Sequence, residues 1–84
     1  MSYEKVTQAK SRLIIGTKQS LKAMKNGDVS EVFIAEDADR KVTQGVIDLA
    51  EELSIPCHYV DSKKRLGQAC GIEVHAATVS IRKP

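Results

Sequence analysis

The chain of 84 residues is 42% hydrophobic and 29% charged, which is ordinary for one small globular domain and unlike a disordered protein. Its 13 Lys and Arg residues nearly balance 11 Asp and Glu residues, so the formal net charge is only +2. No apolar run approaches the ~20 residues of a transmembrane helix, and the first residues lack the apolar core of a signal peptide, so we expect one monomeric, cytoplasmic domain over residues 1–84 that does not associate with membranes.

A first helix is predicted near the start of the chain. Val6, Ala9 and Leu13 recur at helical spacing, which indicates an amphipathic helix over residues 4–14. Gly16 interrupts this pattern and should end the helix. The apolar residues are expected to face the core.

A second helix should begin directly after this glycine. Thr17 is expected to cap it, and the helix should run to about Asn26, where an Asn-Gly pair favours a stop. Lys18, Lys22 and Lys25 lie at positions i, i+4 and i+7 of this helix. They should therefore form one basic stripe on its surface.

The middle of the chain predicts a buried strand and a third helix. Residues 32–35 form a continuous apolar run, which is typical of a strand buried on both faces. Asp37 or Asp39 then caps the helix. The apolar stripe of that helix has five members, which are Val42, Val46, Leu49, Ala50 and Leu53.

The last third predicts a strand at residues 57–60, a helix at residues 63–70 capped by Ser62, and a final strand. Alternating helices and strands at these spacings predict an α/β sandwich, with one central sheet covered on both sides. One face of the final strand should be buried, and its residues are Ala77, Val79 and Ile81.

Charge is unevenly distributed along the chain. Residues 1–27 carry six bases and one acid, residues 28–54 carry two bases and eight acids, and residues 55–84 carry five bases and two acids. If the two basic segments meet on one face, that face would attract nucleic acid. The alternative is that these charges are simply solvated helix surface.

No motif predicts catalysis or metal binding. Cys57 and His58 are neighbours on a predicted strand and point to opposite faces, and nothing orients a base toward Cys70. The acids at residues 36–39 are explained more simply by a helix cap than by a cation site. We therefore expect a protein that is not an enzyme and that holds no cofactor or metal.

Two short segments suit contacts with RNA. Gly16 allows a close backbone approach to a helix start, whose unpaired N–H groups attract phosphate. Lys18 and Lys22 lie one turn apart, and Gln19 can both donate to and accept from a base edge. The second segment lies before the final strand, where two branched apolar residues could either contact unstacked bases or plug the end of the sheet. Its residues are Ile72, Glu73, Val74 and His75.

The segments GTKQSLK, residues 16–22, and SKKRLGQACGI, residues 62–72, resemble the L7Ae/L30e family of ribosomal proteins, which bind kink-turns in RNA. The resemblance extends from Leu13 to Ile81 and is close to the small bacterial members. It implies a three-layer α-β-α sandwich with one central mixed sheet. It also implies a ribosomal or ribosome-associated protein that recognises tandem sheared G·A pairs in structured RNA, such as ribosomal RNA or a riboswitch.

The resemblance also implies which residues contact RNA. The family usually has Asn and Glu where this chain has Lys18 and Gln19. Gln offers one carbonyl acceptor and adds a donor, and Lys attracts phosphate, so we expect an altered sequence preference and a steeper salt dependence. Asp39 falls near an acidic position that some members use beside a flipped-out base. The implied contact residues are Gly16, Thr17, Lys18, Gln19, Lys22, Lys63, Ile72, Glu73, Val74 and His75.

Three other functions fit the same sequence. The chain could be a protein-interaction subunit of a ribonucleoprotein with no direct kink-turn readout, binding through Glu51 and Glu52 of the acidic third helix. In that case, changing Lys18 and Lys22 would have no effect. It could also read a different RNA motif, or correspond to the RNA-binding domain of an rRNA methyltransferase.

Overall fold

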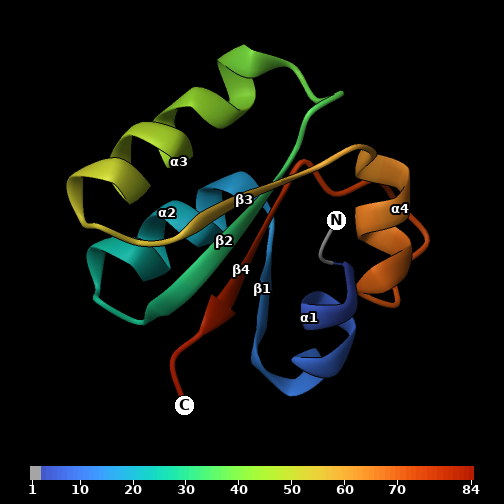
Figure 1. Cartoon of the computed structure of the whole chain (residues 1–84), viewed down its shortest axis with the longest axis horizontal. Helices are drawn as coiled ribbons and strands as arrows, with labels where there is room; N and C mark the ends of the chain where they lie inside the picture. Colours follow the sequence, from blue (N-terminus) through green and yellow to red (C-terminus); the bar gives the residue numbers. More distant parts are fainter. Residues whose placement is uncertain (1–2) are drawn as a thin grey trace.

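A four-stranded sheet lies between two pairs of helices in the computed structural model, which describes residues 3–84 apart from the side chain of Lys10. The helices are α1 (Tyr3–Gln8), α2 (Thr17–Lys25), α3 (Arg40–Glu52) and α4 (Lys63–Ala69). Helices α2 and α3 pack together on one face of the sheet, and α1 and α4 pack together on the other (Figure 1). This arrangement confirms the predicted three-layer α-β-α sandwich.

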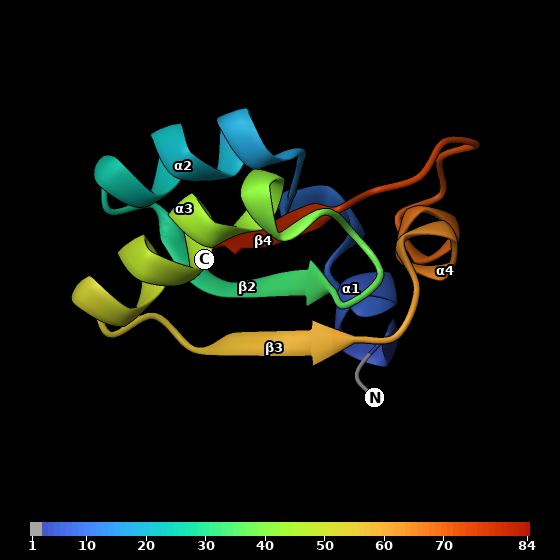
Figure 2. The same ribbon diagram turned by 90° about the horizontal axis from the view of Figure 1, so that it is seen from above.

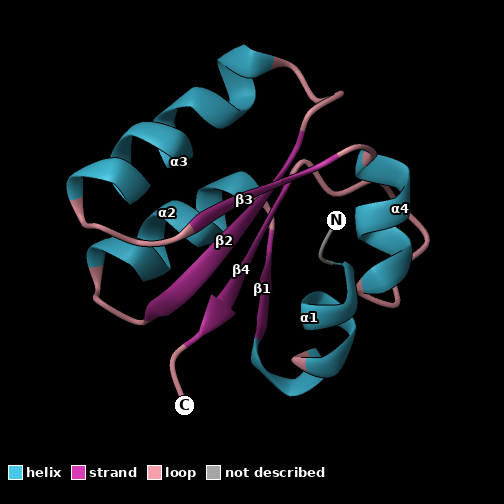
Figure 3. Ribbon diagram, in the orientation of Figure 1, coloured by secondary structure: helices cyan, strands magenta, loops and turns pink. Residues whose placement is uncertain are grey.

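The strands are β1 (Leu13–Ile15), β2 (Val29–Ala35), β3 (Cys57–Val60) and β4 (Thr78–Arg82). Their order across the sheet is β1-β4-β2-β3, so the strand that comes last in the sequence lies between β1 and β2 (Figure 3). β4 is antiparallel to both of these neighbours, whereas β2 and β3 are parallel. The sheet is therefore mixed, as predicted.

Each face of the sheet has its own apolar core. Phe33 and Val79 are fully buried toward α1 and α4, while Val32 and Ile34 are buried toward α2 and α3. Successive strand residues face opposite sides, so a strand covered on both sides buries all of them. This confirms the prediction for residues 32–35, which are all buried within β2. The expectation of one buried face for the final strand is wrong, because β4 is central and covered by helices on both sides.

The first predicted helix is wrong in its second half. α1 ends at Gln8, Lys10–Arg12 form one turn of 3-10 helix, and Leu13 begins β1, where it pairs with Ile81. The helical spacing of the apolar residues is real, but Ile14 and Ile15 are β-branched and favour a strand. Pairing with β4, far along the chain, decides the structure of this segment.

Two of the predicted helix caps are confirmed and one is wrong. The Asp39 carboxylate accepts a hydrogen bond from the Lys41 N–H at 2.9 Å at the start of α3. The Ser62 hydroxyl accepts from the Arg65 N–H at 3.2 Å at the start of α4. Thr17 does not cap α2; it is the first residue of that helix.

The predicted apolar stripe of α3 is correct only at its centre. Val46 and Ala50 are fully buried, but Val42 is 47% exposed and Leu53 is 45% exposed. The buried face also passes through Thr43, which is 1% exposed. Val42 and Leu53 lie on the flank of that face and are therefore partly open to solvent.

Candidate nucleic-acid interface

The start of α2 (residues 16–22, the α2 tip) and the loop at residues 71–77 meet at one end of the sheet. β1 leads into the α2 tip and the loop leads into β4, and these two strands are antiparallel neighbours. The Gly16 N–H donates to the Thr78 carbonyl at 2.9 Å, and the Thr17 and Thr78 hydroxyl oxygens are 3.1 Å apart. Figure 2 shows the α2 tip and the loop at the same end of the molecule.

The residues at the start of β4 join three elements at this end of the sheet. The Ala76 N–H donates to the Lys63 carbonyl at 3.0 Å, which ties the loop to α4. The Ala77 carbonyl accepts from the Ala35 N–H at 3.0 Å, which ties the loop to the end of β2. With the bonds from Thr78 to the α2 tip, this segment fixes α2 and α4 relative to each other.

Gly67 holds the loop against α4. It is buried inside this helix, and a Cβ atom added there would lie only 2.1 Å from the Val74 carbonyl oxygen. The Ile72 N–H also donates to the Gly67 carbonyl at 3.1 Å. The sequence reasoning missed this residue, although a glycine inside a helix costs about 1 kcal/mol relative to alanine and so signals a close approach.

The α2 tip presents positive charge to solvent. Lys18, Gln19 and Lys22 are all exposed, and the first turn of the helix contains no acidic residue. Gly16 precedes the helix with φ of +108°, in the region that favours glycine, and no side chain caps the first N–H groups. The tip can therefore offer backbone donors and ammonium groups to an anion.

The two apolar residues of the loop lie in different environments. Ile72 is half-buried and packs against the core beside α4, so it partly closes the end of the sheet. Val74 is 67% exposed, and Glu73 and His75 beside it are also exposed. Of the two apolar residues, Val74 is the one that is available to a ligand.

Lys63 lies at the same end of the sheet, as the half-buried first residue of α4. Its backbone N–H donates to the Asp37 carboxylate at 2.8 Å. Asp37 therefore joins the segment after β2 to α4. Asp39 caps α3, so its carboxylate is engaged with the backbone.

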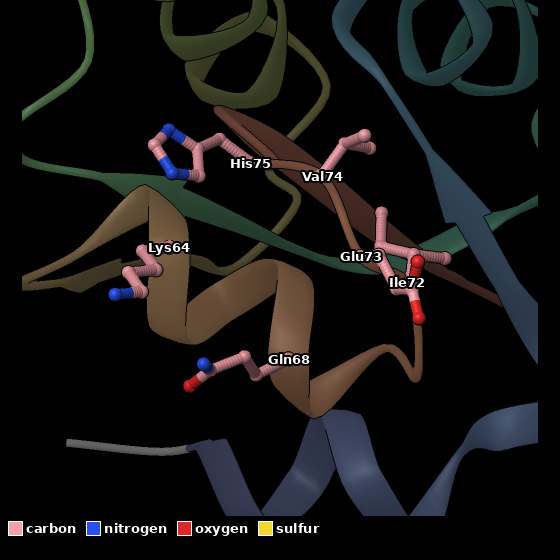
Figure 4. A pocket seen from close by; sticks show the side chains of 6 residues that line it. All are labelled: Lys64, Gln68, Ile72, Glu73, Val74 and His75. Carbon is pink, nitrogen blue, oxygen red and sulfur yellow. The ribbon is translucent and has the colours of Figure 1, made fainter.

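A surface hollow of about 310 Å³ lies between α4 and the loop (Figure 4). The four predicted loop residues line it, and two α4 residues that the sequence reasoning missed complete it. They were missed because exposed polar side chains on a helix carry no local signal of a site. The lining residues are Lys64, Gln68, Ile72, Glu73, Val74 and His75.

Other kinds of site receive no support from residues 3–84. Three or more His, Cys, Asp or Glu side chains gather nowhere in this range as metal ligands would. None of the helices described is long and apolar enough to cross a bilayer. Burial raises the pKa of the Cys57 and Cys70 thiols, so both stay protonated near neutral pH and are poor nucleophiles.

Comparison with known proteins identifies similar sequences along the whole chain. The model of the ribosomal protein L7Ae/L30e/S12e/Gadd45 family matches residues 1–84. An RNA-binding protein of Halalkalibacterium halodurans is 55% identical over 83 residues, covering 99% of this chain and 100% of that protein. RNA-binding protein YbxF of Geobacillus stearothermophilus is 51% identical over 81 residues, covering 96% of this chain and 98% of that protein.

Solved structures show the same fold. The Giardia lamblia 15.5kD RNA binding protein superposes with a TM-score of 0.92 at 28% identity, covering 98% of this chain and 71% of that one. A protein of unknown function from Bacillus halodurans C superposes with a TM-score of 0.83 at 25% identity, covering 96% of this chain and 80% of that one.

Proposed function

Because the chain belongs to the ribosomal protein L7Ae/L30e/S12e/Gadd45 family, we propose that it is an RNA-binding protein that recognises kink-turns with tandem sheared G·A pairs. The observation that carries this proposal is the meeting of the basic α2 tip and the exposed loop at one end of the sheet. The names of the similar bacterial proteins, which are RNA-binding proteins, support RNA as the class of ligand.

The α2 tip would supply phosphate contacts and base readout. The exposed Lys18 and Lys22 neutralise phosphates, and Gly16 has no side chain to block the approach of a backbone. The free N–H groups of the first helical turn add further donors. Gln19 is exposed between the lysines and can read a base edge through both its amide nitrogen and its carbonyl.

The loop would contact the bulged bases. An apolar side chain that is as exposed as Val74 suits the face of an unstacked base. Glu73 and His75 flank it with polar groups, and Lys63 offers a cation nearby. Hydrogen bonds fix the tip and the loop relative to each other, so one RNA can contact both at the same time, as a sharply bent RNA would.

Binding would therefore select the kinked form of an RNA that is flexible when free. Ribosomal RNA or a riboswitch with such a motif is the proposed target. With ribosomal RNA as the target, the protein would be ribosomal or ribosome-associated. Affinity would come mainly from phosphate contacts, and selectivity from the G·A readout and the loop.

A gel-shift titration tests this proposal. One RNA contains a kink-turn, and the matched RNA has its sheared G·A pairs replaced by Watson–Crick pairs. We expect the kink-turn to bind at least about tenfold more tightly, because base-edge contacts discriminate by about 1–3 kcal/mol each. Equal affinity for the two RNAs would contradict the proposal.

A protein-interaction subunit is the second candidate function. The exposure of Val42, Leu53 and Tyr59 on the α3 and β3 side of the molecule favours it. In that case Leu53→Asp would block assembly, whereas Lys18→Ala combined with Lys22→Ala would leave it unchanged. The kink-turn proposal predicts the opposite result for binding to RNA.

A further inference from the structure

We propose that β3 and α3 form the interface of a symmetric dimer of this chain, in which the two copies of β3 pair antiparallel. This inference does not rest on the proposed function, and it puts a dimer in place of the monomer expected from the sequence. β3 lies at one edge of the sheet, next to β2 (Figure 2). The open edge of a strand is a template for pairing with another strand.

Alternate residues of β3 direct their backbone groups away from the sheet. The Pro56 and Val60 carbonyls accept hydrogen bonds from N–H groups in β2 and directly after it, at 3.0 and 2.7 Å. Since successive residues of a strand turn their backbone groups to opposite sides, the N–H and carbonyl groups of Cys57 and Tyr59 point outward. A second, antiparallel copy would therefore pair Cys57 with Tyr59 twice, around a two-fold axis at His58.

The side chains of β3 leave this edge accessible. The His58 ring stacks on Phe33 with the ring centroids 4.9 Å apart, and its Nε2 lies 2.8 Å from the Glu31 carboxylate, so this ring is directed toward β2. β3 contains no Lys and no Pro, and its pairing with β2 has no bulge. It therefore lacks three of the features that commonly protect an edge strand.

One face of α3 lies beside this edge. Arg40, Gln44, Ile47 and Glu51 follow one another at helical spacing, so they share a face of the helix. Burial raises the pKa of Tyr59 and the Arg40 guanidinium opposes this shift, which places Arg40 near β3. The shared face is therefore on the β3 side of α3.

This face is complementary to itself under the same two-fold axis. α3 runs antiparallel to β3, because it returns the chain from the end of β2 to the start of a parallel strand. The two copies of α3 are then also antiparallel, so Arg40 of one copy faces Glu51 of the other, and Gln44 faces Ile47. Arg40 and Glu51 are exposed and form no ion pair within residues 3–84. This charge complementarity favours a second copy as the occupant of the face.

The dimer would leave both candidate RNA interfaces open. The α2 tip and the loop lie at the end of the sheet where β2 finishes, since the Ala35 N–H donates to the Ala77 carbonyl. The two-fold axis places this end of each copy on opposite sides of the dimer. One dimer would therefore present two separate interfaces.

Light scattering over a range of protein concentrations, without RNA, tests the dimer. We expect the mass to rise from 9.2 kDa toward twice this value. Arg40→Glu should raise the dissociation constant at least about tenfold, because like charges then face each other at both ends of the interface. Glu51→Arg should have the same effect for the same reason. An equimolar mixture of the two variants should restore the unmodified affinity, because opposite charges face each other again.

Arg82→Glu is the matched control, because it makes the same change of charge at the end of β4 and should leave the dimer unchanged. A mass of 9.2 kDa at every concentration overturns the proposal and leaves this face to a different protein. A dimer that survives Arg40→Glu, or a mixture that does not recover, also overturns it. Because RNA is absent from these measurements, none of these results bears on the proposed function.

Cross-linking tests the strand pairing separately. Across the axis, the two copies of His58 would have their Cα atoms about 4.5 Å apart, which suits a disulfide. In a chain that carries Cys57→Ser, His58→Cys should therefore cross-link on mild oxidation, whereas Tyr59→Cys should not. Equal cross-linking of the two variants, or none in either, overturns the proposed pairing.

Discussion

The hydroxyl oxygens of Thr17 and Thr78 lie 3.1 Å apart, although 61 positions separate the two residues in the sequence. The contact joins the first residue of α2 to the first residue of β4. It therefore sets the position of the α2 tip relative to the strand from which the loop emerges. Thr78 is fully buried, so water cannot easily replace this hydrogen bond.

Thr78→Val should lower the free energy of unfolding by about 1 kcal/mol, because it removes one hydrogen bond without changing the shape of the side chain much. It should also weaken binding to a kink-turn, since the tip loses one of its attachments. Urea unfolding and RNA titration measure the two effects. Thr17→Val and the double variant complete a thermodynamic cycle, in which additive effects would show that the two hydroxyls do not interact.

Gly67→Ala should destabilise the fold by about 1–3 kcal/mol and displace the loop, because the new methyl group meets the Val74 carbonyl. Gly45→Ala is the matched control. Gly45 lies inside α3 with open space around its Cα, so alanine there should stabilise the fold by about 0.5–1 kcal/mol. Thermal unfolding distinguishes the two variants, and stabilisation by alanine at both positions would show that the loop does not depend on Gly67.

Lys18→Ala combined with Lys22→Ala should weaken binding to different RNAs uniformly and lower the salt slope of binding by about two. The control is Lys25→Ala combined with Lys83→Ala, which removes the same charge from the opposite end of the sheet. Titrations at several salt concentrations give the slope. An unchanged salt slope in the first variant would show that Lys18 and Lys22 do not contact phosphates.

Val74→Asp should abolish kink-turn binding and leave the circular-dichroism spectrum and the stability unchanged, because this side chain is 67% exposed. Ile72→Asp should instead reduce stability, since Ile72 packs against the core. Leu53→Asp serves as a control, because it places the same charge on an exposed apolar site directly after α3. Normal RNA affinity in Val74→Asp would exclude the loop from the interface.

Glu31 should make stability depend on pH. A hydrogen bond from Lys5 at 2.9 Å holds the pKa of Glu31 below its usual value, against the opposing effect of burial, and contact with His58 lowers it further. Stabilisation is therefore present above the unfolded pKa, near 4.5, and is lost as the pH falls through the folded value. Glu31→Gln should cost about 1 kcal/mol at neutral pH and nothing in acid. A pH-independent difference in urea unfolding between the two proteins would contradict this.

The two segments of the candidate site could be predicted from the sequence, but their proximity could not. Each segment can be interpreted from its own residues. One contains Gly16 followed by lysines, and the other contains the apolar residues Ile72 and Val74. That they meet depends on β1 lying beside β4, and the predicted helix over residues 4–14 includes Leu13 and Ile14 of β1. A strand of three residues gives too little periodicity to be separated from the helix before it.

The same limit explains what else was missed. Whether Val42 and Leu53 are buried depends on the rotation of α3 about its axis relative to the sheet. The spacing of the apolar residues is compatible with several rotations, so the sequence does not fix this angle. Gly67 carried a signal, because a glycine within a helix is unfavourable unless something lies close to it. The sequence does not show that this neighbour is the Val74 carbonyl, because the contact depends on how the loop packs against α4.

The central position of β4 has a consequence for the protein during its synthesis. β4 emerges from the ribosome after every other described element, yet it separates β1 from β2. Until it arrives, Gly16 and Ala35 lack the carbonyl partners on Thr78 and Ala77 that hold them in the finished fold. Non-local pairing of this kind is slow to form. If the α2 tip and the loop form the proposed RNA interface, we expect a nascent chain to bind RNA less well than completed copies, since these two segments are not yet joined.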